Sequence, residues 1–201
     1  MMLRHAAVIC ATEMKLVSRN RATATLAVAV PLAIGVYLAT GRPDFGLAPN
    51  ALWPAIVTLQ TLALLGFTIY ITTTSAFAAR RQDLSLKRLR SGESSDAAIV
   101  GGIAMPTVLL ALVQLAAVLT GTAIAGAPAP AAPALLVAAI LGGAAMCSAT
   151  GILTSCITQG AEHAQFTTAP FFFALLSGGV VVMRAGADAS PLQLALPGGA
   201  R

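Results

Sequence analysis

Charge is scarce in this 201-residue chain, and its scarcity excludes most soluble folds. Only 9% of the residues are charged, twelve of them basic and seven acidic, whereas 57% are hydrophobic. A soluble domain of this length needs many more charged side chains to cover its surface. The hydrophobic residues also come in long blocks instead of alternating with polar ones, which is typical of an integral membrane protein.

Acidic, basic and histidine side chains are absent from the interiors of five apolar blocks. Each is about as long as the roughly 20 residues that a helix needs to cross about 30 Å of hydrocarbon. The blocks cover residues 22–40, 52–79, 99–121, 134–158 and 164–183. They predict an all-α polytopic membrane helical bundle, a single domain over residues 1–201 that begins with an entry segment, 1–21. The lack of an acidic or histidine relay at membrane depth disfavours ion-coupled transport.

Cysteine is also rare, and catalytic constellations are missing. The three cysteines, Cys10, Cys147 and Cys156, are odd in number and lack zinc-site spacing. Cys147 and Cys156 lie nine positions apart, so on one helix they point in opposite directions, and we interpret all three as small buried residues. The sequence offers no Ser/His/Asp set, paired carboxylates or metal-ligand cluster, so we expect neither an enzyme nor a metal site.

The few basic residues gather on two of the connections. Before the first block stand Arg4, Lys15, Arg19 and Arg21, and between the second and third stand Arg80, Arg81, Lys87, Arg88 and Arg90. Because basic loops stay on the cytoplasmic side, we expect the N-terminus on the cytoplasmic side of a bacterial cell membrane and the C-terminus on the external side. These residues flank apolar blocks and form no stripe on a folded surface, so nucleic acid is not an expected partner. A cleaved signal peptide is the competing interpretation of the first 40 residues.

The segment from Arg80 to Arg90 predicts an amphipathic cytoplasmic helix that continues from the second block. At helical spacing, Arg80, Arg81, Lys87 and Arg88 share one side, and Leu86 and Leu89 share the other. Asp83 is spaced to pair with Arg80 and Lys87. Such a helix suits a lipid surface or a partner protein. The alternative is that the basic residues serve membrane topology alone.

Two patterns inside the blocks concern helix packing and a possible substrate path. Small residues recur at every fourth position of the fourth block, at Ala139, Gly143, Cys147, Gly151 and Ser155. This stripe predicts close approach of another helix, within the subunit or across a dimer. Four hydroxyl side chains share one face of the second block: Thr61, Thr68, Thr72 and Ser75. Gln60 lies beside this face, and Gln114 lies in the third block. These groups either bond to their own helix carbonyls or form a weakly polar wall along an amphiphile's path.

The order of three weak motifs resembles that of type 2 ABC transporter permeases. The run Asp83-Leu84-Ser85-Leu86-Lys87-Arg88-Leu89-Arg90 is similar to a Gly-Thr-Leu-Lys-Arg-Leu-Arg pattern after that family's second span. Thr12 to Leu16, Arg19 to Arg21 and Pro31-Leu32 resemble its entry helix and first span. Gln159 to Gln165, Pro170 and Ser177-Gly178 resemble its fourth connection and fifth span.

The chain also departs from the family pattern at three places. Leu84 stands where the family often has Gly, and Arg80 where an acidic residue is frequent. The family usually has six spans, and this chain stops at Arg201, about where the sixth would begin. We expect either a truncated chain or a partner that supplies the missing helix.

The resemblance implies the permease subunit of an ABC exporter that moves a drug-like or lipid-like amphiphile outward by alternating access. It implies pairing with a second copy or a related permease, and two cytoplasmic ATPase subunits that bind ATP and magnesium. The entry helix and the Arg80–Arg90 segment would be the coupling residues that transmit the ATPase motion. The only lysines, Lys15 and Lys87, lie outside any G-x-x-x-x-G-K-[ST] loop, so this chain itself is not expected to hydrolyse ATP. Glu162 and His163 occupy a short turn that is either solvated or part of the ATPase interface, and spans one, two and five are expected to line the path.

The main alternative is a membrane protein that does not transport, such as a scaffold or a degenerate permease. The missing sixth span is the strongest support for it. Ion-coupled export is a third possibility.

Overall fold

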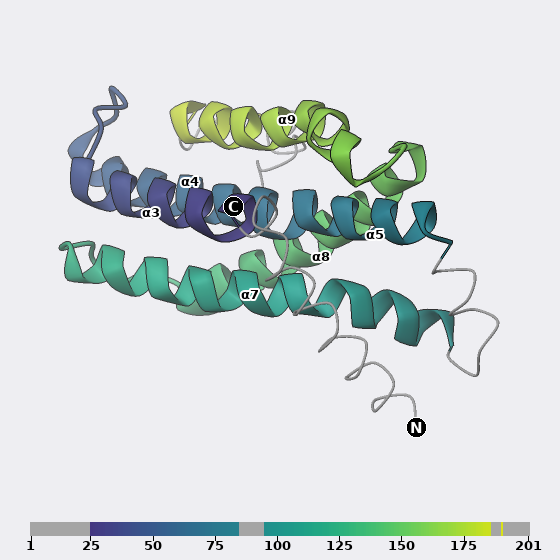
Figure 1. The fold of residues 1–201 in the computed structure, drawn as a ribbon. Coiled ribbons are helices and arrows are strands. Elements are labelled where there is room, and N and C mark those ends of the chain that lie inside the picture. The colour runs from purple at the N-terminus through teal and green to yellow at the C-terminus, as the bar shows by residue number, and fades with distance from the viewer. Residues whose placement is uncertain (1–24, 85–94, 186–189, 191–201) are drawn as a thin grey trace.

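The protein is a bundle of long helices (Figure 1). A computed structural model describes residues 25–84, 95–185 and 190, and within these residues it contains helices and no strand. The elements are η1 (Thr25–Ala29), α3 (Val30–Gly41), η2 (Pro49–Ala51), α4 (Leu52–Leu64), η3 (Leu65–Ile71), α5 (Thr72–Gln82), α7 (Asp96–Ile124), α8 (Pro133–Ile157), η4 (Ala161–His163) and α9 (Ala164–Ala185). Here η1 with α3 is called span one, Pro49–Gln82 span two, α7 span three, α8 span four, and α9 span five.

Four of these helices are long and apolar enough to cross a membrane. They are Pro49–Gln82, Asp96–Ile124, Pro133–Ile157 and Ala161–Ala185. The described part of span one adds a shorter apolar helix, Ala27–Gly41. The predicted all-α, membrane-like architecture is therefore confirmed, and the helix bounds lie close to the five apolar blocks of the sequence.

Local sequence chemistry explains several helix ends. The Ser95 hydroxyl accepts a hydrogen bond from the Ala98 amide at 3.3 Å and caps the start of α7. Pro133 begins α8, where its missing N–H would have no intrahelical partner. Gly126, at φ 101°, ends α7, and the amides of Gly126 and Ala127 bond back to Ala123 and Thr122. This is the Schellman arrangement that glycine favours after a helix.

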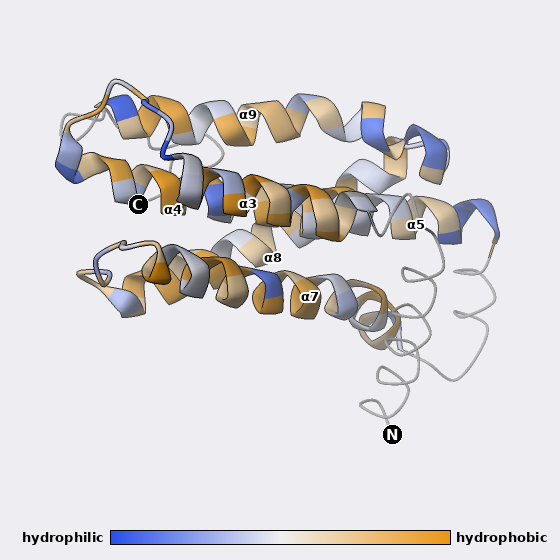
Figure 2. Cartoon of the chain, turned by 60° about the vertical axis from the view of Figure 1, so that its left-hand side comes forward, coloured by the Kyte–Doolittle hydropathy of each residue, from blue (hydrophilic) through white to orange (hydrophobic). Residues whose placement is uncertain are grey.

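Span two lies at the centre of the bundle, with the other spans around it (Figure 1). Of the residues in its most apolar stretch, 67% are buried, against 22% for α8. Strongly hydrophilic residues gather mainly at the two ends of the bundle, whereas the helix bodies are mostly hydrophobic (Figure 2). This distribution fits helices that cross a membrane side by side, with α8 the most exposed to lipid among the four long ones.

The helix of span two runs three residues past the predicted block, 52–79, but does not continue through the amphipathic segment that follows. The helix stops at Gln82, and Leu84 takes the left-handed conformation at φ 55°, with its amide bonded to the Arg81 carbonyl at 3.2 Å. The prediction of a helix running without interruption from the second block through Arg90 is therefore wrong. The periodicity of basic and apolar residues continued past residue 82, but the backbone turns at Asp83 and Leu84. Leu86, Lys87, Arg88, Leu89 and Arg90 lie outside the described residues.

Candidate functional site

Two π-helical segments face one another in the interior of the bundle. One is η1 in span one, and the other is η3 in the middle of span two. A π-turn alters the backbone hydrogen-bond register, so side chains often bond to its carbonyls, and such turns are frequent at functional sites. The Thr72 hydroxyl, for example, donates to the Phe67 carbonyl five residues earlier, at 3.2 Å.

A buried cluster of polar groups joins spans one, two and three at these segments. The Thr68 hydroxyl lies 2.9 Å from the Ala27 carbonyl oxygen in η1 and 2.7 Å from Gln114 Oε1 in α7. Gln114 Nε2 donates to the same Ala27 carbonyl at 3.0 Å. Thr68 and Gln114 are at most 4% exposed. One backbone oxygen of span one thus lies within hydrogen-bond reach of donors from both neighbouring spans.

A second polar pair lies along the same interface, toward the Arg42 end of the bundle. Gln60 Nε2 donates to the Gly35 carbonyl at 2.8 Å and to the Thr122 hydroxyl at 3.0 Å. Thr122 in turn lies 2.8 Å from the Val118 carbonyl of its own helix. In the described part of the chain, every buried side-chain nitrogen and oxygen has a hydrogen-bond partner. The interior polarity is therefore satisfied within the bundle.

The predicted substrate-path residues divide into two groups. Thr61 bonds to its own helix at the Val57 carbonyl, 2.8 Å away, and Thr72 bonds to Phe67 as described. Thr68 and Gln114 instead bond across helices. Local satisfaction accounts for the first pair, and interhelical bonding accounts for the second. None of the four needs a substrate to complete its hydrogen bonds.

Sequence reasoning missed Thr122 and Thr107, which face span two from α7. Thr107 lies 3.2 Å from the Thr73 hydroxyl, and both side chains are buried. The signal was present, because Thr107, Gln114 and Thr122 recur at intervals of seven and eight residues and so share one face of a helix. No sequence pattern marks the Ala27 carbonyl as an acceptor, because its position for the bonds from Thr68 and Gln114 depends on the π-turn around it.

The small-residue stripe of α8 lies against span two. A side chain at Gly143 would place its Cβ 2.6 Å from a terminal methyl of Leu65, and one at Gly151 would lie 3.0 Å from the Tyr70 carbonyl oxygen. Cys147 and Ser155 are buried on the same face, whereas Ala139 is exposed. The close helix approach therefore occurs within the subunit.

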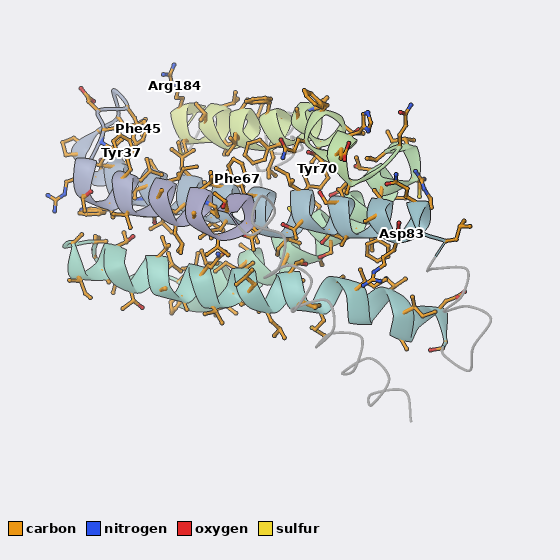
Figure 3. The ribbon with its side chains drawn as sticks, viewed as in Figure 1. Tyr37, Phe45, Phe67, Tyr70, Asp83 and Arg184 are labelled. Carbon is orange, nitrogen blue, oxygen red and sulfur yellow. The ribbon has the colours of Figure 1, made fainter. Side chains whose placement is uncertain are left out.

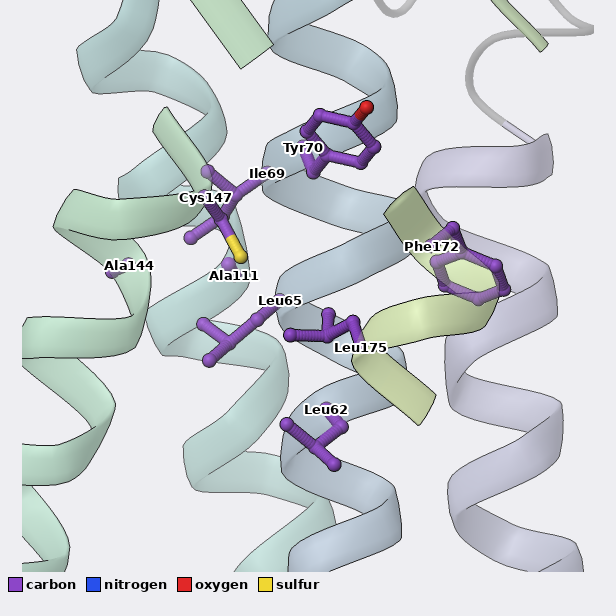
Figure 4. Close-up of a cluster of buried hydrophobic side chains, with 9 residues drawn as sticks. All are labelled: Leu62, Leu65, Ile69, Tyr70, Ala111, Ala144, Cys147, Phe172 and Leu175. Atoms are coloured by element: carbon purple, nitrogen blue, oxygen red, sulfur yellow. The ribbon is translucent and has the colours of Figure 1, made fainter. Parts of the chain in front are cut away.

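Aromatic rings complete the packing around the centre of span two (Figure 4). The Tyr70 hydroxyl lies 3.1 Å from that of Thr154 in α8, and the Tyr70 ring packs on Phe171 of α9 at 4.9 Å between centroids. Phe172 is buried and packs edge-on against Phe67 at 4.6 Å, while Phe173 points outward. Span two is thus in contact with α9 through rings and with α8 through small residues.

At one end of the bundle, Arg81 reaches across to the end of α8. Its guanidinium donates hydrogen bonds to the carbonyl oxygens of Cys156 and Thr158. Asp83, Glu162 and His163 are exposed near this end, and Figure 3 labels Asp83 there. Of the predicted coupling residues that are described, Arg81 has carbonyl partners inside the chain.

At the opposite end, marked by Tyr37 and Phe45 in Figure 3, Arg42 has a comparable place. Its Nη2 donates to the Ala125 carbonyl at the end of α7, at 2.5 Å, and its guanidinium lies 5.0 Å from the centre of the Trp53 ring. Tyr37 is 63% exposed beside it. Tyrosine and tryptophan are enriched where membrane meets water, so these rings indicate one boundary of the bilayer.

The structure corrects one prediction about cysteine. Cys147 is buried against span two, but Cys156 is exposed near the end of α8, so the prediction that it is buried is wrong. The reason is the position of α8 at the margin of the bundle, where only 22% of its most apolar stretch is buried. Cys10 lies outside the described residues. Among the side chains that the structure describes, no three of His, Cys, Asp or Glu come together as a metal site.

Comparisons of the chain with protein-family models, curated proteins and solved structures find no match.

Proposed function

We propose that this chain is the membrane-spanning permease subunit of an ATP-driven ABC exporter that moves an amphiphilic small molecule outward. A separate cytoplasmic ATPase would bind ATP with magnesium and drive alternating access. The chain would act as a pair, with a second copy or a related permease. The helical bundle with membrane-like spans supports the membrane assignment, and the inner end of span two supports the family.

The observation that carries the proposal is the turn after Gln82. In the resembled family, glycine is frequent at the position that Leu84 occupies here. Leu84 has φ 55°, and its amide bonds to Arg81 as the first residue beyond the cap of a helix does. Glycine adopts this conformation without strain, so a family preference for glycine is expected where the chain turns in this way. The backbone at Leu84 thus agrees with the motif even though its side chain does not.

The exposed residues at this end would face the ATPase. Asp83 follows the last residue of span two, the half-buried Arg80 lies in its last turn, and Glu162 and His163 occupy the turn before α9. Leu86 and Leu89 would enter an apolar groove on the ATPase, with Lys87, Arg88 and Arg90 around its rim. An ATPase that moves this surface would move span two directly, because the helix continues to the centre of the bundle.

The decisive experiment is co-purification from the native membrane. The tagged chain should retain an ATPase carrying a phosphate-binding loop, and the reconstituted complex should hydrolyse ATP faster when an amphiphilic substrate is added. An undetectable ATPase under conditions that preserve other transporter complexes would contradict the proposal and favour a membrane protein that does not transport.

A matched pair of variants separates ATPase contact from membrane topology. Leu86→Asp with Leu89→Asp places charge in a desolvated contact, so we expect the purified permease to lose its ATPase. Arg88→Glu changes the rim and should mainly alter salt dependence and association rate. All five basic residues remain in the leucine variant to hold the loop inside. Full ATPase retention and stimulation in that variant would leave topology as the only role of the segment.

The orientation is tested separately with single cysteines in a chain lacking Cys10, Cys147 and Cys156. The proposal places residue 94 in the cytoplasm and residue 200 outside. A membrane-impermeant maleimide should therefore label Ala200→Cys, and not Ser94→Cys, in intact cells. Labelling of Ser94→Cys from outside would reverse the proposed orientation.

A further inference from the structure

The last turn of α8 has carbonyl groups that its own helix does not satisfy. Every α-helix ends with carbonyl oxygens that lack intrahelical partners and together form the negative end of its dipole. In α8, Arg81 donates to two of the carbonyls near this end, those of Cys156 and Thr158. A guanidinium is suited to this role, because its planar fork presents several donors in fixed directions and keeps its charge.

A second contact holds the same two segments together. A side chain at Gly160 would place its Cβ 2.6 Å from Gln82 Oε1, so the turn after α8 lies directly on the residue that follows Arg81. Within that turn, the Thr158 amide bonds to Thr154 at 3.2 Å and the His163 amide to Gly160 at 3.1 Å. The inner end of span two is thus fixed to the connection between spans four and five.

We propose that Arg81 is a positioning residue that joins the inner end of span two and the turn of residues 158–163 into one unit. Glu162 and His163 are carried on this turn, so Arg81 sets where they stand relative to Asp83. Motion that enters at the end of span two would then reach α8 and α9 together. This consequence for transport rests on the proposed function, whereas the connection that Arg81 makes between the two segments does not.

Arg42 provides a matched control at the other end of the bundle. It also donates to a carbonyl after a helix, that of Ala125, and its guanidinium stacks on Trp53. The turn it contacts has its own amide bonds, from Ala125 to Gly121 at 3.0 Å and from Ala127 to Thr122 at 3.1 Å. The two arginines therefore make the same kind of contact, and a different set of backbone amides reports on each: Thr158 and His163 for Arg81, and Ala125 and Ala127 for Arg42.

The test is amide hydrogen exchange on the full chain in lipid nanodiscs. In Arg81→Ala, exchange of the Thr158 and His163 amides should rise about tenfold, the factor that corresponds to roughly 1.4 kcal/mol of protection. The Ala125 and Ala127 amides should stay at their wild-type rates. Arg42→Ala should show the reverse pattern. Unchanged exchange at Thr158 and His163 in Arg81→Ala, or an equal rise at both ends, would overturn the proposal.

Arg81→Lys keeps the test decisive if Arg81→Ala does not fold. Lysine retains the charge but cannot present two nitrogens in the same fork, so exchange at residues 158–163 should lie above that of wild type. Exchange identical to wild type would mean that charge alone stabilises this end, and the proposal that Arg81 acts by bonding two carbonyls would be wrong.

A functional measurement distinguishes positioning from direct contact with an ATPase. With the partner ATPase present, Arg81→Ala should retain it at the wild-type level but lose severalfold in substrate-stimulated hydrolysis, and Arg81→Lys should recover part of the loss. Loss of the ATPase itself would make Arg81 a contact residue and overturn its positioning role. If wild type retains no ATPase, the proposed function fails, and hydrogen exchange alone decides whether Arg81 joins the two segments.

Discussion

The two sides of span two are held to their neighbours by different interactions. Toward spans one and three, Gln60, Thr68 and Gln114 form directional hydrogen bonds between buried groups. Toward α8, the close approach depends on the missing side chains of Gly143 and Gly151, and hydrogen bonds from Tyr70 and Arg81 are added only toward the end of α8. Hydrogen bonds specify one helix register, because each donor must meet its acceptor, whereas a surface of small residues specifies closeness.

This difference suggests where the bundle can change shape. A helix held by complementary polar groups leaves them unpaired if it slides, and unpaired groups are costly in hydrocarbon. A helix contact made by small residues alone loses mainly dispersion contacts when it slides. We therefore expect spans one, two and three to behave as one rigid group, and the first half of α8 to move relative to it more easily than the second half, which Tyr70 and Arg81 hold through Thr154, Cys156 and Thr158.

The largest effect should come from filling the contact with α8. Gly151→Leu places a side chain against the Tyr70 carbonyl, which cannot move without the backbone, and overpacking typically costs about 1 to 3 kcal/mol. Gly143→Leu should cost less, because it meets the flexible end of Leu65. Thermal unfolding of the purified chain in detergent measures both.

Gly142→Leu is the matched control for these two variants. It lies one position from Gly143, but nothing lies within 4 Å of the site that its Cβ would occupy. Leucine is also the better helix former, so stability should stay within about 1 kcal/mol of wild type or rise. A Gly142→Leu variant as unstable as Gly151→Leu would show that this face of α8 is covered by another helix.

The next effect should come from the polar side. Gln114→Leu removes a donor to the Ala27 carbonyl and one of the two acceptors within reach of the Thr68 hydroxyl, so the Thr68 proton is left with the Ala27 carbonyl. Interhelical hydrogen bonds in membranes contribute on average about 0.6 kcal/mol and at most roughly 1.7. We expect a loss of about 1 kcal/mol, since Thr68 still donates to Ala27.

The control for Gln114→Leu is Thr120→Val, also on α7. Its hydroxyl bonds to the Ala116 carbonyl of the same helix at 2.7 Å, and the residue is exposed. Urea or thermal unfolding should hardly distinguish it from wild type. Equal destabilisation by both variants would mean that the interhelical bonds add nothing beyond the loss of a polar group.

An effect no larger than that of Gln114→Leu, and of opposite sign, is expected where span two ends, at Leu84. Leu84→Gly should stabilise by about 1 kcal/mol, because the left-handed conformation costs roughly 1 to 2 kcal/mol for a residue with a side chain and nothing comparable for glycine. Leu84→Ala, which keeps a Cβ, should give no such gain. A destabilised Leu84→Gly variant would place the Leu84 side chain in a contact that outweighs the strain.

The sequence predicted the helices well and their internal geometry poorly. The fifth block, residues 164–183, differs from α9, Ala164–Ala185, by two residues, because apolar composition alone marks a span. The π-turns in η1 and η3 left no comparable mark. They depend on whether a carbonyl finds a side-chain donor from another helix, as Ala27 does in Thr68 and Gln114, and such partners are distant in sequence.

The candidate site shows the same division. Helical periodicity placed Arg81 with the basic residues of a cytoplasmic surface, but its partners, Cys156 and Thr158, follow 75 and 77 positions later. The spacing of the α8 stripe predicted close packing but not which helix packs there, and the structure shows that this helix is span two. Interactions fixed by neighbours in sequence were predictable, and those fixed by tertiary contacts were not.

The smallest predicted effect separates the two threonines that the sequence placed on one face of span two. Thr61 bonds to the Val57 carbonyl of its own helix, so Thr61→Val should change stability by less than about 0.5 kcal/mol. Thr68→Val removes a bond to span one and should cost about 0.6 kcal/mol or somewhat more. The two changes are chemically identical and occur seven residues apart on one helix. Thermal unfolding of both variants under the same conditions isolates the interhelical contribution, and a Thr61→Val loss equal to that of Thr68→Val would assign it to the helix alone.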